Sequence, residues 1–325
     1  MAVRERKMGA ATRDAYGEAL VELGTQDVRV VVLDADLSKS TKSGGFAKKF
    51  PDRFLNVGIA EANMVSMAAG LATTGLIPFA HSFASFLMCK TFDQLRMGVA
   101  NPRVNAKFVG SHGGISLGED GASQMAVEDV ALACALPNFQ VLVPADGAAT
   151  RALTLAIAAH DGPVFMRTGR PKAPVVYGPE AEFPLGGSKL LQEGRDVTIV
   201  ANGLLVFEAL QAADLAAEAG LSVGVLDCYS VKPLDEAAVE RAARTSGALL
   251  VAEEHLTTGG LGAMVAQAVA RRYPVPIEFV GVEDRYGESG TPEALLVHYG
   301  MTAANLLSRL QALVARKTQG AGVPA

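Results

Sequence analysis

The stretch VRVVVLDAD, Val28–Asp36, decides the fold, because its β-branched run ends abruptly in polar and small residues. A short apolar run bounded by polar residues is typical of a strand buried in a parallel sheet. Similar runs recur between longer Ala- and Leu-rich stretches of helical period: Asn105–His112, Phe139–Asp146, Asp196–Gly203, Leu221–Tyr229, Gly247–His255 and Pro276–Asp284. This alternation predicts an α/β fold of βαβ units, with ligand contacts at the polar ends of the strands.

A segment rich in Pro and Gly, RPKAPVVYGPEAEFPLGGSK (Arg170–Lys189), divides this series into two halves. It has neither helical nor strand period, so we interpret it as an interdomain linker. The sequence therefore predicts two doubly wound domains, residues 1–175 and residues 190–325. The tail Lys317–Ala325 is expected to be frayed.

Composition excludes several classes of function. A formal net charge of -5 over 325 residues offers no basic surface for nucleic acid. The N-terminus lacks the apolar core of a secretory signal, and polar residues and a proline interrupt the apolar run Met64–Ala80, so we expect no membrane span. Cys89, Cys134 and Cys228 show no CxxC spacing and indicate neither disulfides nor a zinc site. These features favour a cytoplasmic protein without a metal site of its own.

The stretch NVGIAEANMVSMAAGL, Asn56–Leu71, contains one ionisable side chain, Glu61, at the start of a helix-like run. One interpretation is an acidic residue that the helix dipole favours. The other is a proton relay, because a charged carboxylate among small and apolar residues is costly without a partner.

Three further motifs have both a structural and a functional interpretation. Phe83, Phe86 and Phe92 are spaced as on one face of a core helix, and the same spacing suits an aromatic wall against a planar ring. The loop Gly110–Gln124, GSHGGISLGEDGASQ, is either a functional loop or a surface turn. The stretch Thr257–Val269 lacks the third glycine of a dinucleotide fingerprint, so we interpret it as close packing between a strand and a helix.

A series of blocks, taken in order, resembles the C-terminal half of transketolase, and the likeness covers nearly the whole chain. The blocks are ATRDAYGEAL, DADLSKS, NVGIAEANM, SFASFLMCKTFDQLR, GSHGGISLGEDGAS, VLVPAD, DGPVFMRTGRP, YSVKPLD and EDRYGESGTPEALLVHYGM. The resemblance implies a pyrimidine-binding domain for thiamine diphosphate followed by the transketolase C-terminal domain. The diphosphate-binding domain of that family, with its GDG…N metal motif, is missing from the sequence.

The resemblance thus implies one subunit of a split transketolase, which transfers a two-carbon ketol unit between sugar phosphates. An N-terminal partner subunit would bring the diphosphate-binding domain and Mg²⁺ or Ca²⁺, so that thiamine diphosphate is shared between subunits. Two copies of each chain would form a heterotetramer.

The resemblance also implies the residues that bind the cofactor. Glu61 matches the glutamate that hydrogen-bonds the aminopyrimidine ring and promotes its imino tautomer, which activates the thiazolium carbon. This match gives the solitary carboxylate a catalytic role. The other matching cofactor-side positions are Asp36, Phe83, Phe86 and Phe92.

A second set of positions matches the substrate site of the family. Residues that grip the sugar phosphate match Arg13, Ser40, His112 and Arg167, of which His112 is also expected to be catalytic. Two guanidiniums, an imidazole and a hydroxyl make a phosphate site without a metal. Asp120 matches a residue that recognises a substrate hydroxyl.

Two positions depart from the family pattern and bear on the substrate. Gln124 stands where transketolases usually carry a substrate-contacting histidine, and Cys89 where many members carry an aromatic residue. Two alternatives remain open. The β subunit of a 2-oxo acid dehydrogenase first component shares the domains and Glu61 but has no use for a sugar-phosphate clamp. A non-catalytic regulatory subunit would have no need of Glu61.

Overall fold

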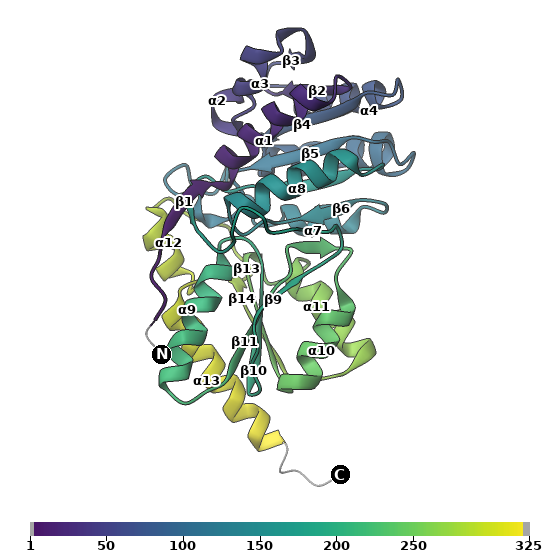
Figure 1. Cartoon of the computed structure of the whole chain (residues 1–325). Helices are drawn as coiled ribbons and strands as arrows, with labels where there is room; N and C mark the ends of the chain where they lie inside the picture. Colours follow the sequence, from purple (N-terminus) through teal and green to yellow (C-terminus); the bar gives the residue numbers. More distant parts are fainter. Residues whose placement is uncertain (1–2, 321–325) are drawn as a thin grey trace.

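The computed structural model describes residues 3–320 and consists of two α/β halves, the first coloured purple to teal and the second green to yellow in Figure 1. Each half contains a largely parallel sheet with helices on both faces. The predicted α/β fold class with two doubly wound halves is therefore confirmed.

The first sheet has seven strands within the described residues, and Val28–Asp36 supplies one of the inner ones. Every strand pair is parallel except the pair at one edge, between β12 and β6. The β2 residues are buried on both faces, as their unbroken apolar run predicts. In sheet order the strands are β12 (Ser230–Lys232), β6 (Gln140–Leu142), β7 (Val164–Arg167), β5 (Lys107–Ser111), β4 (Ile77–Phe83), β2 (Val30–Asp34) and β3 (Phe54–Asn56).

Helices cover both faces of this sheet through small and branched apolar side chains. One face packs against α1 (Thr12–Gln26), α3 (Gly44–Lys49) and α8 (Gly147–Ala159). The other face packs against α4 (Glu61–Ala72), α5 (Ala84–Cys89), the π-helical turn η2 (Leu95–Ala100) and α7 (Asp129–Ala135). Short turns lie between the strands: α2 (Ser38–Thr41), η1 (Pro51–Arg53), α6 (Phe92–Gln94) and η3 (Ile115–Leu117).

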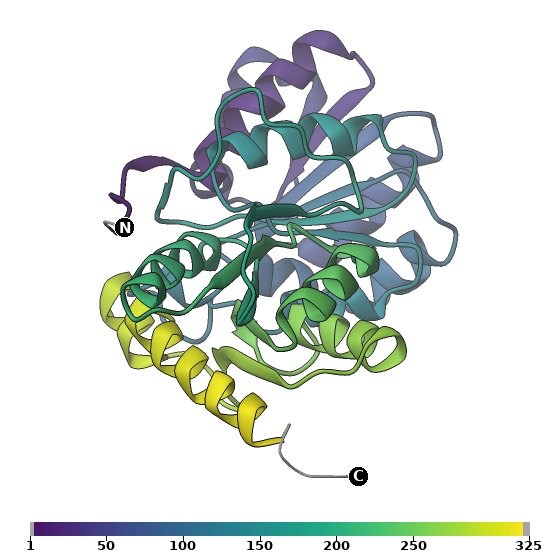
Figure 2. The ribbon, with the colours of Figure 1, turned by 60° about the horizontal axis from the view of Figure 1, so that its bottom comes forward.

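The second sheet has five strands within residues 3–320, and its only antiparallel pair there joins β9 to β11. Figure 2 shows helices on its two sides, α9 (Leu205–Glu218) and α13 (Ala303–Gly320) on one and α10 (Glu236–Ser246) and α11 (Leu261–Arg272) on the other. The short helix α12 (Pro292–His298) lies near the first half. In sheet order the strands are β14 (Ile277–Val282), β13 (Leu249–Leu256), β10 (Val197–Ala201), β11 (Val223–Asp227) and β9 (Lys189–Gln192).

The segment predicted to be a free linker is held against the first half. Its residues Lys172–Pro174 form strand β8, which pairs antiparallel with β1 (Met8–Ala11), so the expectation that this segment contains no strand is wrong there. Further along, Phe183 is 4 % exposed and packs on Tyr229 of the second half. A few contacts to distant residues order this segment, and such contacts leave no local period in the sequence.

The carboxyl ends of both sheets meet where the two halves touch. Backbone hydrogen bonds cross from Gly203, after β10, to Val143, after β6, and from Leu256 of β13 to Val127. Ligands of open α/β sheets usually bind at this edge. Part of the edge of each sheet is therefore occupied by the other half of the chain.

Three smaller expectations also concern the structure. Cys89, Cys134 and Cys228 are free cysteines. Across residues 3–320 the longest helices remain too short or too polar to cross a membrane. The tail from Lys317, expected to be frayed, is helical as far as Gly320, and its remainder lies outside the described residues.

Candidate active site

The predicted site residues gather at the carboxyl edge of the seven-stranded sheet, on the side of β2, β4 and β5. Parallel strands place their carboxyl ends at one edge, so residues far apart in sequence meet there. Asp36 and Ser40 follow β2, Phe83 ends β4 and His112 follows β5. Arg13 lies in the first turn of α1 and Glu61 begins α4.

Glu61 is buried, with 4 % of its surface exposed, and it has two partners. Ser82 donates its hydroxyl proton to Oε1 at 3.2 Å, and Lys90 Nζ lies 3.5 Å from Oε2. These partners lie 21 and 29 residues further along the chain, on β4 and after α5. Glu61 thus lacks polar partners among its neighbours in sequence but has them in the folded structure.

Two of the three predicted aromatic residues lie near Glu61, because Lys90 contacts both Glu61 and the Phe86 ring, on which Phe83 stacks. The rings of Phe83 and Phe86 stack at 5.5 Å and 18°, and Phe83 also stacks on the His112 imidazole at 3.9 Å. Phe92 begins a separate turn, α6, and packs against the core. The interpretation of the three rings as one face of a core helix is wrong, because Phe83 belongs to a strand.

The residues beside Glu61 fit a flat, nitrogen-containing ring. Lys90 Nζ lies 4.2 Å from the centre of the Phe86 ring as well as beside the Glu61 carboxylate. Half of the Lys90 side chain is exposed, so its ammonium can swing away. A ring that replaced it would stack on Phe86 and present a ring nitrogen to Glu61.

Next to these rings, Arg13 joins Ser40 and His112. Its Nη1 donates to the backbone oxygen of Ser40 at 3.1 Å and lies 3.0 Å from His112 Nε2. Because arginine can only donate, Nε2 is the acceptor, and Nδ1 carries the proton that faces Ser111 Oγ at 2.8 Å. His112 has a positive φ of 60°, a strained conformation of the kind that clusters at functional sites.

Burial lowers the pKa of His112 to about 3, with the charges of Arg13, Arg170 and Lys42 acting in the same direction. The imidazole is therefore neutral near pH 7, and the positive charge of the site belongs to those three side chains. Arg13 Nε is buried and has no hydrogen-bond partner among the residues that the structure describes. A buried cationic donor without a partner is suited to an anion.

The loop that carries Ser40 and Lys42 is held by a buried carboxylate. Asp34 ends β2 and accepts hydrogen bonds from the backbone N–H of Leu37 and from the hydroxyls of Thr41 and Ser43. Lys42 itself pairs with Asp14 on α1 at 3.0 Å. Asp34, at the end of β2, thus fixes the position of the segment Leu37–Ser43, which carries Ser40 and Lys42.

Arg167 does not belong to the cationic group that Arg13, Lys42 and Arg170 form around His112. It is 5 % exposed, its Nε lies 3.2 Å from Asp129 Oδ2, and its Nη2 donates to the backbone oxygens of Ala126 and Glu254. These three contacts engage the guanidinium inside the protein. The expectation that Arg167 grips a substrate phosphate is corrected accordingly.

Arg170, which the sequence interpretation missed, lies where Arg167 was expected. It is one of the charges that lower the pKa of both Arg13 and His112, and 36 % of its side chain is exposed. It donates to the backbone oxygen of Leu117 at 2.6 Å and pairs with Glu119. The motif RTGRP contains two arginines, and only the packing distinguishes them.

The remaining predicted residues lie at the rim. Asp36 is exposed, has a φ of 64° and accepts a hydrogen bond from Asn56 Nδ2 at 3.0 Å. Asp120 is exposed at the tip of its loop, and Gln124 is half-buried, with its backbone oxygen bonded to Ser85 Oγ. Desolvation and the Glu128 carboxylate raise the pKa of the Cys89 thiol to about 12, so this thiol stays neutral.

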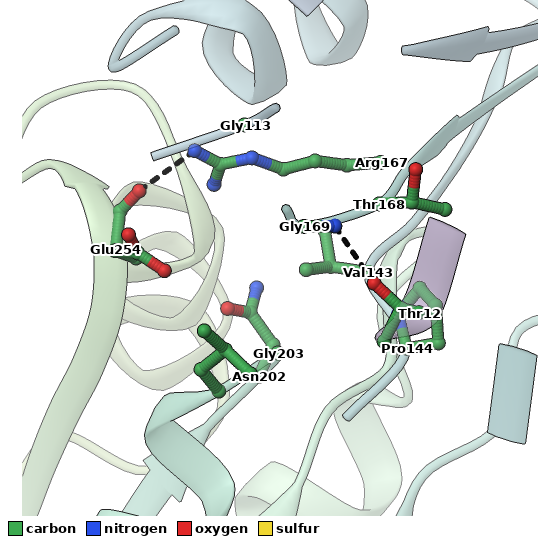
Figure 3. Close-up of a pocket in the computed structure, with 11 residues that line it drawn as sticks. Thr12, Gly113, Val143, Pro144, Arg167, Thr168, Gly169, Asn202, Gly203 and Glu254 are labelled. Carbon is green, nitrogen blue, oxygen red and sulfur yellow. Dashed lines mark hydrogen bonds between the residues drawn. The ribbon is translucent and has the colours of Figure 1, made fainter. Parts of the chain in front are cut away.

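A cavity of about 30 Å³ lies behind this group, between the two halves (Figure 3). In Figure 3 Arg167 points across it to the Glu254 backbone, and Gly169 N–H donates to Thr12 Oγ1. The Asn202 side chain projects into the same space. The volume suits one or two water molecules, so this cavity is too small for a sugar phosphate.

Neither a metal site nor a dinucleotide site is found among the described residues. Among residues 3–320, His, Cys, Asp and Glu side chains form no group of three or more that could hold a metal ion. At the stretch Thr257–Val269, the Glu253 carboxylate accepts the N–H groups of Leu261 and Gly262 at the start of α11, and a Cβ at Gly262 would lie 2.9 Å from the Phe279 ring. The interpretation of that stretch as close strand-to-helix packing is confirmed.

Comparison with known proteins identifies both halves of the chain. Residues 8–175 match the family model "Transketolase, pyrimidine binding domain", and residues 186–306 match "Transketolase, C-terminal domain". The 6-deoxy-6-sulfo-D-fructose transketolase subunit SqwH of Clostridium sp. (strain MSTE9) is 42 % identical, over 94 % of this chain and 95 % of that protein.

Full-length relatives are about twice as long as this chain. Transketolase of Homo sapiens is 38 % identical over 94 % of this chain but only 49 % of its own length. A solved structure described as "Split gene transketolase, inactive beta4 tetramer" superposes with a TM-score of 0.89 at 47 % identity, covering 95 % of this chain and 100 % of that one. The chain belongs to the transketolase family, in the group of split transketolase subunits, and the family implies thiamine diphosphate as cofactor.

Proposed function

We propose that this chain is the C-terminal subunit of a thiamine diphosphate-dependent transketolase and supplies the catalytic Glu61 and the substrate anion site. The observation that supports this most directly is the position of the cationic group beside Glu61 and the Phe86 ring, at one sheet edge. Phe83 joins the two, because it stacks on Phe86 and on His112. The site thus offers adjacent places for a flat ring and for an anion.

The pyrimidine ring of the cofactor would stack on Phe86 and face the Glu61 carboxylate in place of Lys90. Asp36 would contact the cofactor from the rim, and Phe92 would support the wall from the core. When bound, thiamine diphosphate supplies the nucleophilic carbon that carries the two-carbon unit. The task of Glu61 is to hold and release a proton at its Oε2 against the ring nitrogen, within a pocket that Phe83 and Phe86 shield from water.

The substrate phosphate would bind among Arg13, Ser40, Lys42 and Arg170. Two guanidiniums supply paired N–H donors, and the free Arg13 Nε supplies one more. An anion that engages Arg13 also releases the lone pair of His112 Nε2. Burial is the main cause of the low pKa of His112, so the imidazole stays neutral and can accept a hydrogen bond from a substrate hydroxyl at Nε2. Asp120 and Gln124 would contact the sugar hydroxyls at the rim.

The terminal anion of the sugar need not be a phosphate. The relative from Clostridium is named for a sulfosugar, and a sulfonate presents the same three-oxygen face to arginines that a phosphate does. We therefore include 6-deoxy-6-sulfo-D-fructose as a second candidate substrate beside the sugar phosphates. Comparing kcat/KM for the two classes assigns the chain to one of them.

The partner would be an N-terminal subunit with the diphosphate-binding domain and its Mg²⁺ or Ca²⁺, in a heterotetramer. The coverage of half a full-length transketolase supports this proposal. Both alternatives to a transketolase subunit fit the site less well: a 2-oxo acid gives the cationic group no role, and a regulatory subunit gives none to Glu61.

The test is reconstitution. The purified chain alone should show negligible ketol transfer and weak thiamine diphosphate binding, and addition of the N-terminal subunit should restore both. Ketol transfer is followed with a ketose phosphate donor and an aldose phosphate acceptor, and cofactor binding by calorimetry. Full turnover by the chain alone would exclude a divided active site, and decarboxylation of 2-oxo acids by the complex would favour the dehydrogenase alternative.

A further inference from the structure

The substrate loop, Gly113–Gly121, is held from behind by the second half of the chain. The backbone N–H of Ser116, buried in this loop, donates to Glu254 Oε1 at 2.5 Å. A Cβ at Gly114 would lie 2.4 Å from Glu254 Cδ, so the loop backbone rests directly on this carboxyl group. The loop directly follows His112 and carries Asp120, both of which the proposed function uses.

Other contacts extend the same support toward the tip of the loop. A Cβ at Gly118 would lie 3.2 Å from the Pro292 ring, and one at Gly121 would lie 2.5 Å from Ser289 Oγ. Both glycines also have positive φ values, so the backbone conformation and the close approach each favour glycine there. The loop is therefore shaped against the second half along its length.

The position of Glu254 is itself fixed. It lies in the buried part of β13 and is 7 % exposed. Arg167 donates to the backbone oxygen of Glu254 at 2.8 Å and to that of Ala126 at 2.7 Å, which joins β13 to the far end of the loop region. The neighbouring His255 accepts the N–H of Ala131 at 3.1 Å.

We propose that Glu254 is a positioning residue for substrate binding. Through the hydrogen bond from Ser116 N–H, the second half of the chain, which contributes no candidate catalytic side chain, sets the position of His112 and Asp120. This inference rests on the proposed function of the first half and adds a role for the second. Without Glu254 the Ser116 N–H is left buried and unpaired, so the loop moves away to reach water and loses its place around the substrate.

Glu253 provides a matched control on the same strand. It is 2 % exposed and also accepts backbone N–H groups, those of Leu261 and Gly262 at 2.8 Å. These donors belong to α11, within the second half, and far along the chain from the substrate loop. Removal of either carboxyl group costs buried hydrogen bonds, but only Glu254 bonds to the loop.

The kinetic test uses the complete complex with the N-terminal subunit. Glu254→Ala should raise KM for the anionic sugar about tenfold, the loss expected for one buried hydrogen bond, with kcat changed far less. Glu254→Gln should restore KM, because the amide oxygen accepts the same N–H. Glu253→Ala should lower Tm and leave KM unchanged. Equal KM values for Glu254→Ala and Glu253→Ala would overturn the proposal.

A second measurement is independent of turnover. In hydrogen exchange of the full-length chain alone, Glu254→Ala should speed exchange of the Gly113–Gly121 amides, and Glu253→Ala should speed exchange at the start of α11 instead. If the complex has no ketol transfer activity while the loop responds in this way, the proposed function fails and the support of the loop stands. If loop exchange is the same in Glu254→Ala as in the unmodified chain, the inference itself is wrong.

Discussion

The carboxyl edge of the seven-stranded sheet has an open part and a covered part, and the two treat charge differently. At the open part, beyond β2, β4 and β5, Arg13 Nε has no partner within residues 3–320, and half of the Lys90 side chain is exposed. At the covered part, beyond β7 and β6, the guanidinium of Arg167 is shared between Asp129 and two backbone oxygens. The open part therefore leaves positive charge available to a ligand, whereas the covered part pairs its positive charge with groups of the protein.

Ligands of open α/β sheets bind at the carboxyl ends of the strands, and this rule identifies the correct edge of the sheet but not the part of it that binds a ligand. Polar residues gather at both parts because strands end there in either case. At the covered part the edge of the second sheet lies opposite, and Glu254 on that edge accepts hydrogen bonds from Ser116 and Arg167 in place of a ligand. Substitutions at the open part should therefore damage activity, and substitutions at the covered part should damage stability.

The largest effect is expected at the open part, for Glu61→Gln in the reconstituted complex. Turnover should fall by roughly a hundred- to ten-thousandfold, because an amide cannot take up and release a proton at neutral pH. Folding should be nearly unaffected, as shown by an unchanged circular dichroism melt. Glu18→Gln, an exposed acid on α1, is the control. Near-normal rates in Glu61→Gln would reduce this residue to a favourable helix start.

Arg167→Ala should instead damage stability, because it leaves Asp129 buried and uncompensated. Burial already raises the pKa of Asp129 to about 6 although Arg167 opposes the rise. Loss of one partner of a buried ion pair costs roughly 3–5 kcal/mol, measurable by urea denaturation. Arg167→Ala together with Asp129→Ala should recover part of the loss. If Arg167→Ala is as stable as the unmodified chain but binds substrate poorly, Arg167 contributes to the substrate site after all.

Arg170→Ala and Arg13→Ala should show the reverse pattern. Each removes a charge-assisted contact to the substrate anion, expected to be about 1.5–3 kcal/mol or a rise in KM of one to two decades. Unphosphorylated sugars should be affected far less, and unfolding should change little, since Arg170 is partly exposed. An equal rise in KM for charged and uncharged sugars would assign these arginines a structural or cofactor role.

The sequence predicted the open part of the edge better than the covered part. Arg13, Ser40, Glu61, Phe83, Phe86 and His112 do gather at one edge. The fold class and seven strands, β2, β5, β6, β10, β11, β13 and β14, followed from hydrophobic periods, which are local, whereas the inner strands β4 and β7 were not predicted. What failed depends on contacts between distant residues: the partners of Glu61, the strand Lys172–Pro174, and the choice between Arg167 and Arg170. Within RTGRP both arginines follow the same strand, and only Asp129 and Glu254, from elsewhere in the chain, decide which one is buried.

His112 gives the open part a pH dependence in stability. Its folded pKa of about 3 lies below the ordinary 6.5, so between these values the unfolded chain binds more protons and stability falls as pH falls. The difference is about 2 kcal/mol between pH 7 and pH 5. His112→Asn, which tolerates the positive φ, should flatten this decline in denaturation curves measured across that range. An unchanged decline would show that other groups cause it.

The smallest effect is expected for Gln124→His, at the rim of the open part. Glutamine donates and accepts hydrogen bonds but, unlike histidine, cannot become a cation or transfer a proton near neutral pH. The Gln124 side chain is half-buried, and its backbone is held by Ser85, so the substitution changes the rim without moving it.

Contacts that only orient a hydroxyl would survive this change, whereas contacts that stabilise a developing alkoxide would differ. We therefore expect the ratios of kcat/KM among ketose and aldose phosphates, and between sugar phosphate and sulfosugar, to shift by several-fold rather than by decades. Stability should stay constant, which distinguishes the rim from the covered part. If histidine at position 124 leaves every ratio unchanged, specificity is set deeper in the site, by the anion-binding group that Arg13 and Arg170 form.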